Sequence, residues 1–111
     1  MTATGSPISD LNPIFIASEI ELEIHSKKTG TRKIVMDDKF FTGYRKNIVE
    51  KDEILVGIII PYTKENQYFC AYKQARRRED DIAIVNSAIN VNFEPNTTRI
   101  SAINFAFGGM A

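Results

Sequence analysis

Apolar and polar residues alternate strictly from Glu19 to His25, and this period of two constrains the fold more than any other feature of the chain. Ile20, Leu22 and Ile24 alternate with acidic side chains and one histidine. Successive side chains of a strand point to opposite faces, so the pattern predicts a half-buried strand with an acidic outer face. The fold is therefore expected to be based on strands.

Further strands are expected along the chain, each bounded by turn-forming residues. A turn at residues 26–31, which contains Gly30, predicts a hairpin. The continuous aliphatic run that stops at Pro61 is typical of a strand covered on both faces. Residues 94–98 predict the loop of a second hairpin. The expected strands span residues 31–36, 54–60, 67–75, 82–93 and 100–107.

One short helix is expected near the N-terminus, running to about Ala17 after the segment Ser6-Pro7-Ile8-Ser9-Asp10. Ser9 or Asp10 can act as its N-cap, and Pro13 is tolerated only in the first turn. Asp10 has a second interpretation, in which it binds a ligand hydroxyl at the helix start. The residues alone favour the cap. The segment 37–46 is expected to be irregular.

These expectations together give an α+β chain of mostly antiparallel strands with a short N-terminal helix. Its 111 residues are about the length of one small domain. A boundary is expected at the polar segment 62–66, which follows Pro61. The C-terminal apolar strand is followed directly by Gly108-Gly109, without a polar tail. We therefore expect the chain to be a piece of a larger protein.

The composition narrows the class of function. The net charge is zero and the pI is about 6.6, so neither nucleic acid nor a membrane is an expected partner. The single Cys70 excludes an internal disulfide and supplies too few thiolates for an iron–sulfur cluster. Its alternation with Tyr68 and Tyr72 predicts a packed core thiol. One such thiol fits a reducing compartment, most simply the cytosol.

The chain has one histidine, His25, and the alternation of its strand points this side chain outward. A hydrolytic triad or a zinc site would lack its usual central residue. No catalytic residue and no metal ligand is therefore expected in this chain.

The charges are most concentrated at residues 76–81, where three consecutive arginines meet three consecutive acids between two expected strands. Such a segment is either a charged surface turn whose ion pairs contribute little, or a positioned site that faces an anionic or redox-active ligand. Lys73 is likewise either a solvated strand end or a cation held over an electron-rich ring. The residues by themselves leave both interpretations open.

Five segments, in the same order, resemble the FAD domain of the xanthine dehydrogenase/oxidase family of molybdenum hydroxylases. The resemblance covers nearly the whole chain, and its long central motif is specific to that family and the similar aldehyde oxidases. The matching segments are Ser6–Pro13, Phe40–Lys46, Glu53–Leu55, Tyr72–Ala83 and Phe107–Ala111.

The resemblance implies a division of the chain and a function. Residues 1–62 would form the end of a PCMH-type FAD-binding domain, and residues 67–111 the start of a CO-dehydrogenase-flavoprotein-like C-terminal domain. In this family FAD receives electrons from iron–sulfur clusters and passes them to NAD or oxygen, while hypoxanthine and xanthine are hydroxylated to urate. Molybdopterin and the [2Fe-2S] clusters would lie outside this chain, in a homodimeric enzyme of the cytoplasm or peroxisome.

The resemblance also implies roles for individual residues. The FAD contacts would be Ser6, Asp10, Leu55 and Lys73. A mobile segment, residues 77–81, would lie beside the flavin and influence access of NAD and oxygen; we call it the acceptor-access loop. Its implied functional residues are Arg77, Arg78, Asp80 and Asp81. Fixed charges at such a place would tune the flavin, while the cofactor performs the redox chemistry.

The family's main phosphate-binding loop would precede Ser6, so the isolated chain is expected to bind FAD weakly or not at all and to oxidise no purine. Three alternatives remain open at this point. The chain could derive from the flavin domain of an aldehyde oxidase, it could be a separate flavin subunit, or it could be a non-catalytic β-rich interaction module.

Overall fold

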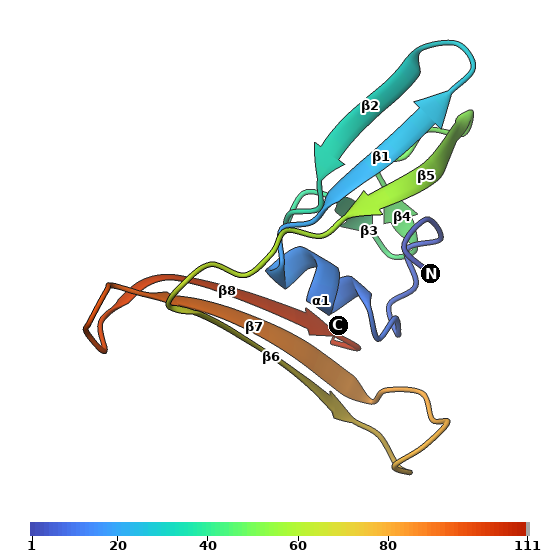
Figure 1. Cartoon of the computed structure of the whole chain (residues 1–111). Helices are drawn as coiled ribbons and strands as arrows, with labels where there is room; N and C mark the ends of the chain where they lie inside the picture. The colour runs from blue at the N-terminus through green and yellow to red at the C-terminus, as the bar shows by residue number, and fades with distance from the viewer. Residues whose placement is uncertain (111) are drawn as a thin grey trace.

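The computed structural model describes residues 1–110 as two three-stranded antiparallel sheets, a small two-stranded sheet and one short helix. The sheet orders are β2-β1-β5, β3-β4 and β6-β7-β8 (Figure 1). The elements are β1 (Glu21–Ser26), β2 (Gly30–Val35), β3 (Phe41–Gly43), β4 (Lys46–Asn47), β5 (Glu53–Ile59), β6 (Gln67–Gln74), β7 (Val85–Phe93), β8 (Ile100–Gly108) and α1 (Asn12–Ala17).

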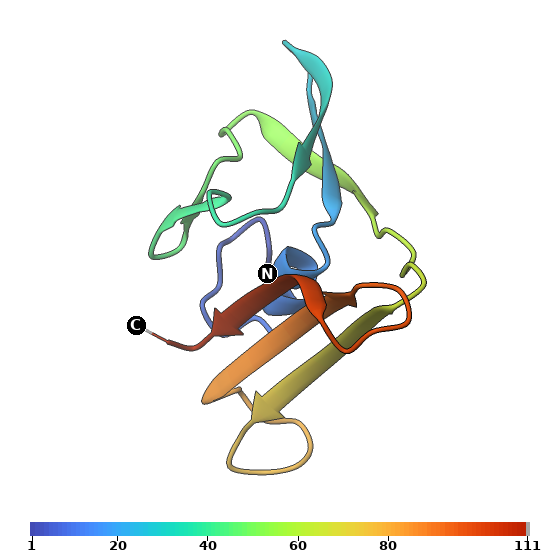
Figure 2. The same cartoon turned by 90° about the vertical axis from the view of Figure 1, so that its left-hand side faces the viewer.

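Helix α1 lies between the two larger sheets (Figures 1 and 2) and packs on both. Phe15 and Ile16 pack on the first core, which is built around β1; its buried members are Ile20, Leu22, Ile24, Met36 and Phe40. Ile14 and Ile16 pack on the second core, whose buried members are Ala17, Ala88 and Ala106. Ile16 therefore contributes to both cores, and the helix joins the two sheets. This helix is too short to cross a membrane, and residues 1–110 contain no other.

Strand β1 has the half-buried pattern that its alternation predicts. Leu22, Ile24 and Ser26 are buried, while Glu21 and Glu23 are only partly covered. The predicted hairpin is confirmed, because β1 pairs with β2 in a regular antiparallel register from Glu21 opposite Val35 to Ser26 opposite Gly30.

The prediction that β5 is covered on both faces is wrong. A bulge interrupts its pairing with β1, so that Gly57 lies opposite Glu23 and Leu55 opposite Ile24. Leu55 therefore joins the first core, whereas Ile54 lies opposite the exposed His25 and is itself 68% exposed. Among the described residues β5 is an edge strand, and no layer covers its outer face.

The second sheet has one covered and one open face. The inner face, toward α1, carries small and amide side chains of β7, namely Asn86, Ala88 and Asn90. The outer face is mostly apolar, and its members from β8 are exposed; these are Ile103, Phe105 and Phe107.

The prediction that Cys70 is a packed core thiol is wrong, because this thiol is exposed. Cys70 lies opposite Ile89 on the outer face of the sheet. Its neighbours Tyr68 and Tyr72 are more than 60% exposed on the same face. The alternation was assigned correctly, but it does not reveal which face α1 covers.

Two buried asparagines of β7 fix the helix on the sheet. The Asn90 amide donates to the carbonyl of Ala17 at 2.9 Å, and the Asn86 amide donates to the carbonyl of Ser9 at 3.0 Å. The Gln67 amide donates in turn to Asn90 Oδ1 at 2.8 Å. These bonds satisfy one carbonyl at the C-terminal end of α1 and one just before its start, where intrahelical partners are lacking.

The helix begins later than predicted, and its predicted cap is absent. Leu11 occupies the N-cap position without a side-chain cap bond, and Pro13 lies in the first turn as expected. Ser9 still accepts the Asn12 N–H with its Oγ at 3.2 Å, but from outside the cap position. Asp10 lies before the N-cap position and does not cap the helix; its carboxylate pairs with Lys73.

The segment expected to be irregular contains the short hairpin β3–β4. Phe40 is fully buried and meets Phe41 edge to face, with ring centroids 4.9 Å apart. The Asn47 amide donates to the carbonyl of Ala3 at 2.9 Å, which ties the N-terminal segment to this hairpin. The aromatic pair and the amide explain why the segment is ordered despite its lack of periodicity.

An ion pair links the two outer strands of the first sheet across β1. Arg32 donates to Glu53 through Nε at 2.6 Å and through Nη2 at 2.8 Å, and the Glu50 N–H donates to the same carboxylate at 2.8 Å. The Glu53 side chain is 5% exposed. The Arg32 hydrogen bonds, followed by that of Glu50, lower the pKa of Glu53 to about 2, and the pair raises the pKa of Arg32.

This ion pair predicts how stability depends on pH. A carboxylate with a lowered folded-state pKa stabilises the fold above its ordinary pKa, and this contribution disappears as the pH falls from about 4.5 to about 2. Glu53→Gln should therefore be less stable than the wild type at pH 7, and the difference should shrink across that window. Urea unfolding at pH 7, 4 and 2.5 measures it, with the exposed Glu65→Gln as control. A difference that does not change with pH would contradict the assignment.

The asparagine bonds predict a second effect on stability. Asn90→Ala leaves the buried Ala17 carbonyl and the Gln67 amide without their partner, so it should lower the free energy of unfolding by about 1–3 kcal/mol. Asn92→Ala, on the same strand at a half-buried position, is the matched control and should cost less. Chemical denaturation of both variants tests this; equal losses would show that Asn90 acts only through its volume.

Candidate functional site

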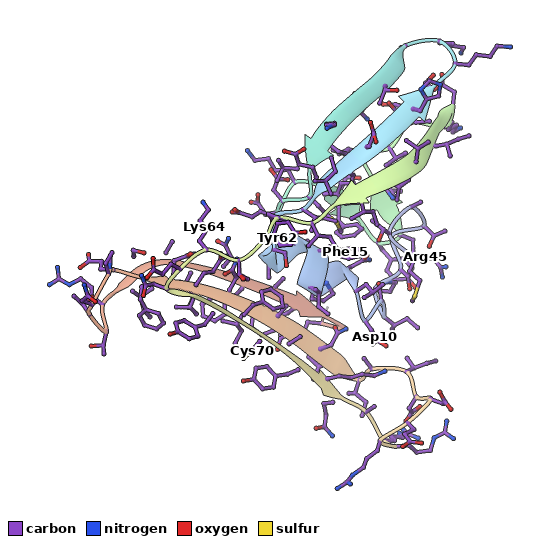
Figure 3. The ribbon with its side chains drawn as sticks, viewed as in Figure 1. Asp10, Phe15, Arg45, Tyr62, Lys64 and Cys70 are labelled. Carbon is purple, nitrogen blue, oxygen red and sulfur yellow. The ribbon has the colours of Figure 1, made fainter. Side chains whose placement is uncertain are left out.

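Lys73 and Asp10 form an ion pair between the end of β6 and the segment before α1. Lys73 Nζ lies 2.9 Å from Asp10 Oδ2, and it also donates to the carbonyl of Asp81 at 2.6 Å. Lys73 lies opposite Asn86 on the inner face of the sheet. The Asn86 amide binds the carbonyl of Ser9, and Asp10 is the next residue along the chain (labelled in Figure 3). The Lys73 ammonium group, which lies beside Asn86, therefore reaches Asp10.

Asp81 organises the acceptor-access loop. Its carboxylate accepts the N–H groups of Arg77 and Ile82, each at 2.9 Å, and the Arg77 guanidinium donates to the Asp80 carbonyl at 3.1 Å. Just before the β-ladder resumes, the Ile84 N–H donates to the carbonyl of Gln74 at 2.8 Å.

Strand β7 begins at Val85 instead of the predicted residue 82. The difference has a local cause, because the Ile82 N–H is already bound to the Asp81 carboxylate and cannot join the ladder. Asp80 adopts a positive φ of 50°, which turns the chain back toward β7. The charged segment is therefore a closed turn, which lengthens the connection between β6 and β7.

A small hollow at this connection is lined only by residues 73–78 and has a volume of about 340 Å³. Three arginines and Lys73 make its lining strongly cationic. The Arg77 side chain is 71% exposed and lies 3.8 Å from Asp81. The loop thus places both signs of charge in solvent next to the Asp10–Lys73 pair.

Ser6 lies in a second, larger pocket of about 460 Å³ between the N-terminal segment, the β3–β4 hairpin and the end of β8. Its lining is mainly apolar and aromatic, with one cation at Arg45 (labelled in Figure 3). The Ser6 carbonyl accepts the Asn12 side-chain amide at 3.3 Å.

The structure thus brings some of the predicted site residues together and separates others. Asp10, Lys73 and Asp81 form one contact cluster with Arg77. Ser6 lies at the neighbouring pocket, and Leu55 packs in the first core on β5, in a different sheet from Lys73.

Three aromatic residues that line the larger pocket were not among the predicted site residues. They are Phe41, Tyr44 and Phe107, which lie in the segment expected to be irregular and in the last predicted strand. The structure explains the glycine at position 5, since its φ is positive at 58° and a Cβ there would lie 3.0 Å from the Arg45 carbonyl carbon. This close approach brings the N-terminal segment against the hairpin and closes one side of the pocket.

The chemistry available at the Asp10–Lys73 pair is that of polar recognition. An ammonium group has three N–H donors, and Lys73 uses two of them within the chain. Both side chains are partly exposed, at 36% for Lys73 and 54% for Asp10. The pair can therefore donate to and accept from a neutral polar ligand. Residues 1–110 contain no cluster of three His, Cys, Asp or Glu side chains suited to a metal ion.

Two family models match consecutive parts of the chain. The FAD binding domain in molybdopterin dehydrogenase matches residues 2–63, and the CO dehydrogenase flavoprotein C-terminal domain matches residues 70–111. The two matches follow each other in the order that the resemblance implied.

Curated relatives agree with these models. The chain is 53% identical over 108 residues to xanthine dehydrogenase/oxidase of Gallus gallus, and 53% identical over 111 residues to xanthine dehydrogenase of Drosophila pseudoobscura pseudoobscura. Each comparison covers 97% of this chain but only 8% of the relative. The chain therefore spans a small part of the length of these proteins.

Solved structures show the same fold. A carbon monoxide dehydrogenase from Hydrogenophaga pseudoflava matches with a TM-score of 0.82 at 25% identity, covering 96% of this chain and 35% of that one. Quinoline 2-oxidoreductase from Pseudomonas putida 86 matches with a TM-score of 0.75 at 23% identity, covering 97% and 35%. The chain therefore belongs to the family of FAD-binding regions of molybdopterin dehydrogenases, and xanthine dehydrogenases are members to which it is similar.

Proposed function

We propose that this chain forms one side of the FAD site of a xanthine dehydrogenase-type oxidoreductase. One observation carries the proposal. Asp10 and Lys73, which the family resemblance named separately as FAD contacts, are 63 residues apart in the chain and 2.9 Å apart in the structure. The identity of 53% to xanthine dehydrogenases supports the same assignment.

In the whole enzyme, FAD would take electrons from iron–sulfur clusters and pass them to NAD or oxygen during hydroxylation of hypoxanthine and xanthine to urate. The molybdopterin and [2Fe-2S] groups would be held by other parts of that enzyme, which we propose to be a cytoplasmic or peroxisomal homodimer. This chain's residues would bind and orient the flavin and control what reaches it.

The residues present fit part of FAD. The Asp10–Lys73 pair is neutral as a unit, so it suits an uncharged polar part of the cofactor better than its pyrophosphate, which Asp10 would repel. One N–H of Lys73 and the second oxygen of Asp10 would form the contacts. When bound, FAD supplies the hydride and electron transfer that protein side chains cannot perform.

Ser6 and Leu55 complete the proposed contacts. Ser6 lines the larger pocket, which could receive part of the cofactor. Leu55 is half-buried, so part of its side chain remains available to pack on a ring. Its position on β5 requires the cofactor to reach both sheets, which fits an extended dinucleotide.

The acceptor-access loop would control the approach of NAD or oxygen. Arg77 and Arg78 line the same hollow as Lys73, and the Asp81 carbonyl binds Lys73. The arginines are exposed, so the charges of the loop, Asp80 included, would act at the edge of the flavin site. A cationic hollow attracts the phosphates of a dinucleotide, while the acids oppose them.

We further propose that the chain divides as the resemblance implied, with residues 1–62 in the PCMH-type unit and residues 67–111 in the C-terminal unit. The two larger sheets fall on either side of this boundary, since β5 ends at Ile59 and β6 begins at Gln67.

The isolated chain is expected to bind FAD weakly or not at all, because the proposed contacts provide no phosphate-binding loop. Titration of the purified chain with FAD, followed by flavin fluorescence, measures this. Binding with a submicromolar Kd would contradict the expectation and would show that these residues hold the cofactor by themselves.

The proposed function is best tested in a complete enzyme. Residues 2–110 would replace the matching segment of the Gallus gallus relative, and the chimera should retain FAD and reduce NAD with xanthine. Lys73→Met in the chimera should then weaken FAD binding by roughly tenfold or more, the effect of losing a charged hydrogen bond. FAD content and NADH formation are the two measurements.

Lys28→Met is the matched control, because this lysine lies in the turn between β1 and β2 and has only a loose exposed contact with Asp52 at 3.9 Å. It should leave both measurements unchanged. A chimera that holds no FAD even without further change, or a Lys73→Met chimera with normal FAD affinity, would rule out the proposed role.

A further inference from the structure

We propose that Asp10 and Lys73 act as a clamp that positions the acceptor-access loop. The clamp runs from the Asp10 carboxylate through the Lys73 ammonium group to the Asp81 carbonyl. It would make the segment before α1 and the loop move as one body. The consequence for the flavin rests on the proposed function, whereas the clamp itself rests only on contacts within this chain.

The contacts that define the clamp converge on a single atom. Lys73 Nζ donates to Asp10 at 2.9 Å and to the Asp81 carbonyl at 2.6 Å. Hydrogen bonds from a charged donor are stronger than those between neutral groups. Here one charged donor binds two segments that are far apart in the chain, one at Asp10 and one at Asp81. Lys73 therefore links the loop to the N-terminal segment.

Asp81 is well suited to transmit this restraint. Its carbonyl takes the Lys73 hydrogen bond, while its carboxylate closes the loop through the Arg77 and Ile82 N–H groups. Fixing the backbone of Asp81 thus also fixes where its carboxylate lies. If Lys73 releases the carbonyl, the carboxylate is free to leave Arg77, and the loop opens at its first residue.

The other end of the clamp is held rigidly. Asp10 follows Ser9, whose carbonyl accepts the buried Asn86 amide and whose Oγ accepts the Asn12 N–H. Asp10 is therefore anchored through its neighbour both to β7 and to the start of α1. A carboxylate at this place can act on the loop without touching it, so we regard Asp10 as a positioning residue that acts through Lys73.

The geometry also leaves room for a ligand. The third N–H of Lys73 is not used by Asp10 or Asp81, so a bound flavin could accept it without breaking the clamp. Ligand contact and loop position would then be coupled through one ammonium group, and the coupling would be reciprocal.

Amide hydrogen exchange, measured by NMR on the full chain without FAD, tests the clamp. The Arg77 N–H reports the loop, because it is bound to the Asp81 carboxylate. Lys73→Met should raise its exchange rate roughly three- to tenfold, the factor expected for loss of one hydrogen bond. Asp10→Asn should raise it by less, and Lys73→Arg should restore most of the protection.

The Ile84 N–H is the internal reference, since it is bound to the Gln74 carbonyl beyond the loop, just before β7. Its rate, like those of β7 and β8, should not change. Lys28→Met is again the matched control and should alter neither reporter. An unchanged Arg77 rate in both Lys73→Met and Asp10→Asn would overturn the proposal, and so would a rise at Arg77 that Ile84 and the β7–β8 amides share equally.

The measurement is independent of the flavin. If the Arg77 exchange rate rises as expected but the chimera with the Gallus gallus relative does not bind FAD, the clamp stands and the proposed function fails. If the chimera works but Arg77 does not respond, the cofactor assignment stands and the clamp fails.

Discussion

The arrangement of this molecule depends on the amide side chains of Asn86 and Asn90, which hold a helix of six residues on a three-stranded sheet. So short a helix has little stability of its own, and its flanking carbonyls need partners. Small side chains beside the asparagines, Ala88 and Ala106, let the helix approach closely. Once the helix is fixed, Ile16 can reach the first core, and the two sheets become one structure.

The parts of the fold that sequence reasoning found are those with a regular side-chain period. The alternation at β1 and the turn at Gly30 predicted the first hairpin, and it is present. The second hairpin, β7–β8, was predicted equally well because its loop residues are typical turn formers. Asp10 and Lys73 were predicted as site residues from the family resemblance and not from a side-chain period. Their contact could not be foreseen, because it depends on how α1 lies on the sheet.

The errors share a physical origin, namely that a period gives the faces of a strand but not what covers them. Cys70 was placed in a core because its face is aromatic, yet α1 covers the opposite face. Asp10 was favoured as a cap because it precedes a helix, yet the helix begins after Leu11 and the Asp10 carboxylate pairs with a lysine far along the chain. In both cases a tertiary contact outweighed a local preference.

The bulge between β1 and β5 has a consequence for how this region can vary. Val56 is the extra residue, so that Leu55 lies opposite the buried Ile24 and Ile58 opposite the buried Leu22. The strand thus holds two alternations that are out of phase. Exchanges among isoleucine, valine and leucine would preserve both, whereas a change of one residue in length would turn one half of the strand over. Related chains should therefore vary freely here in aliphatic identity while keeping the number of residues constant.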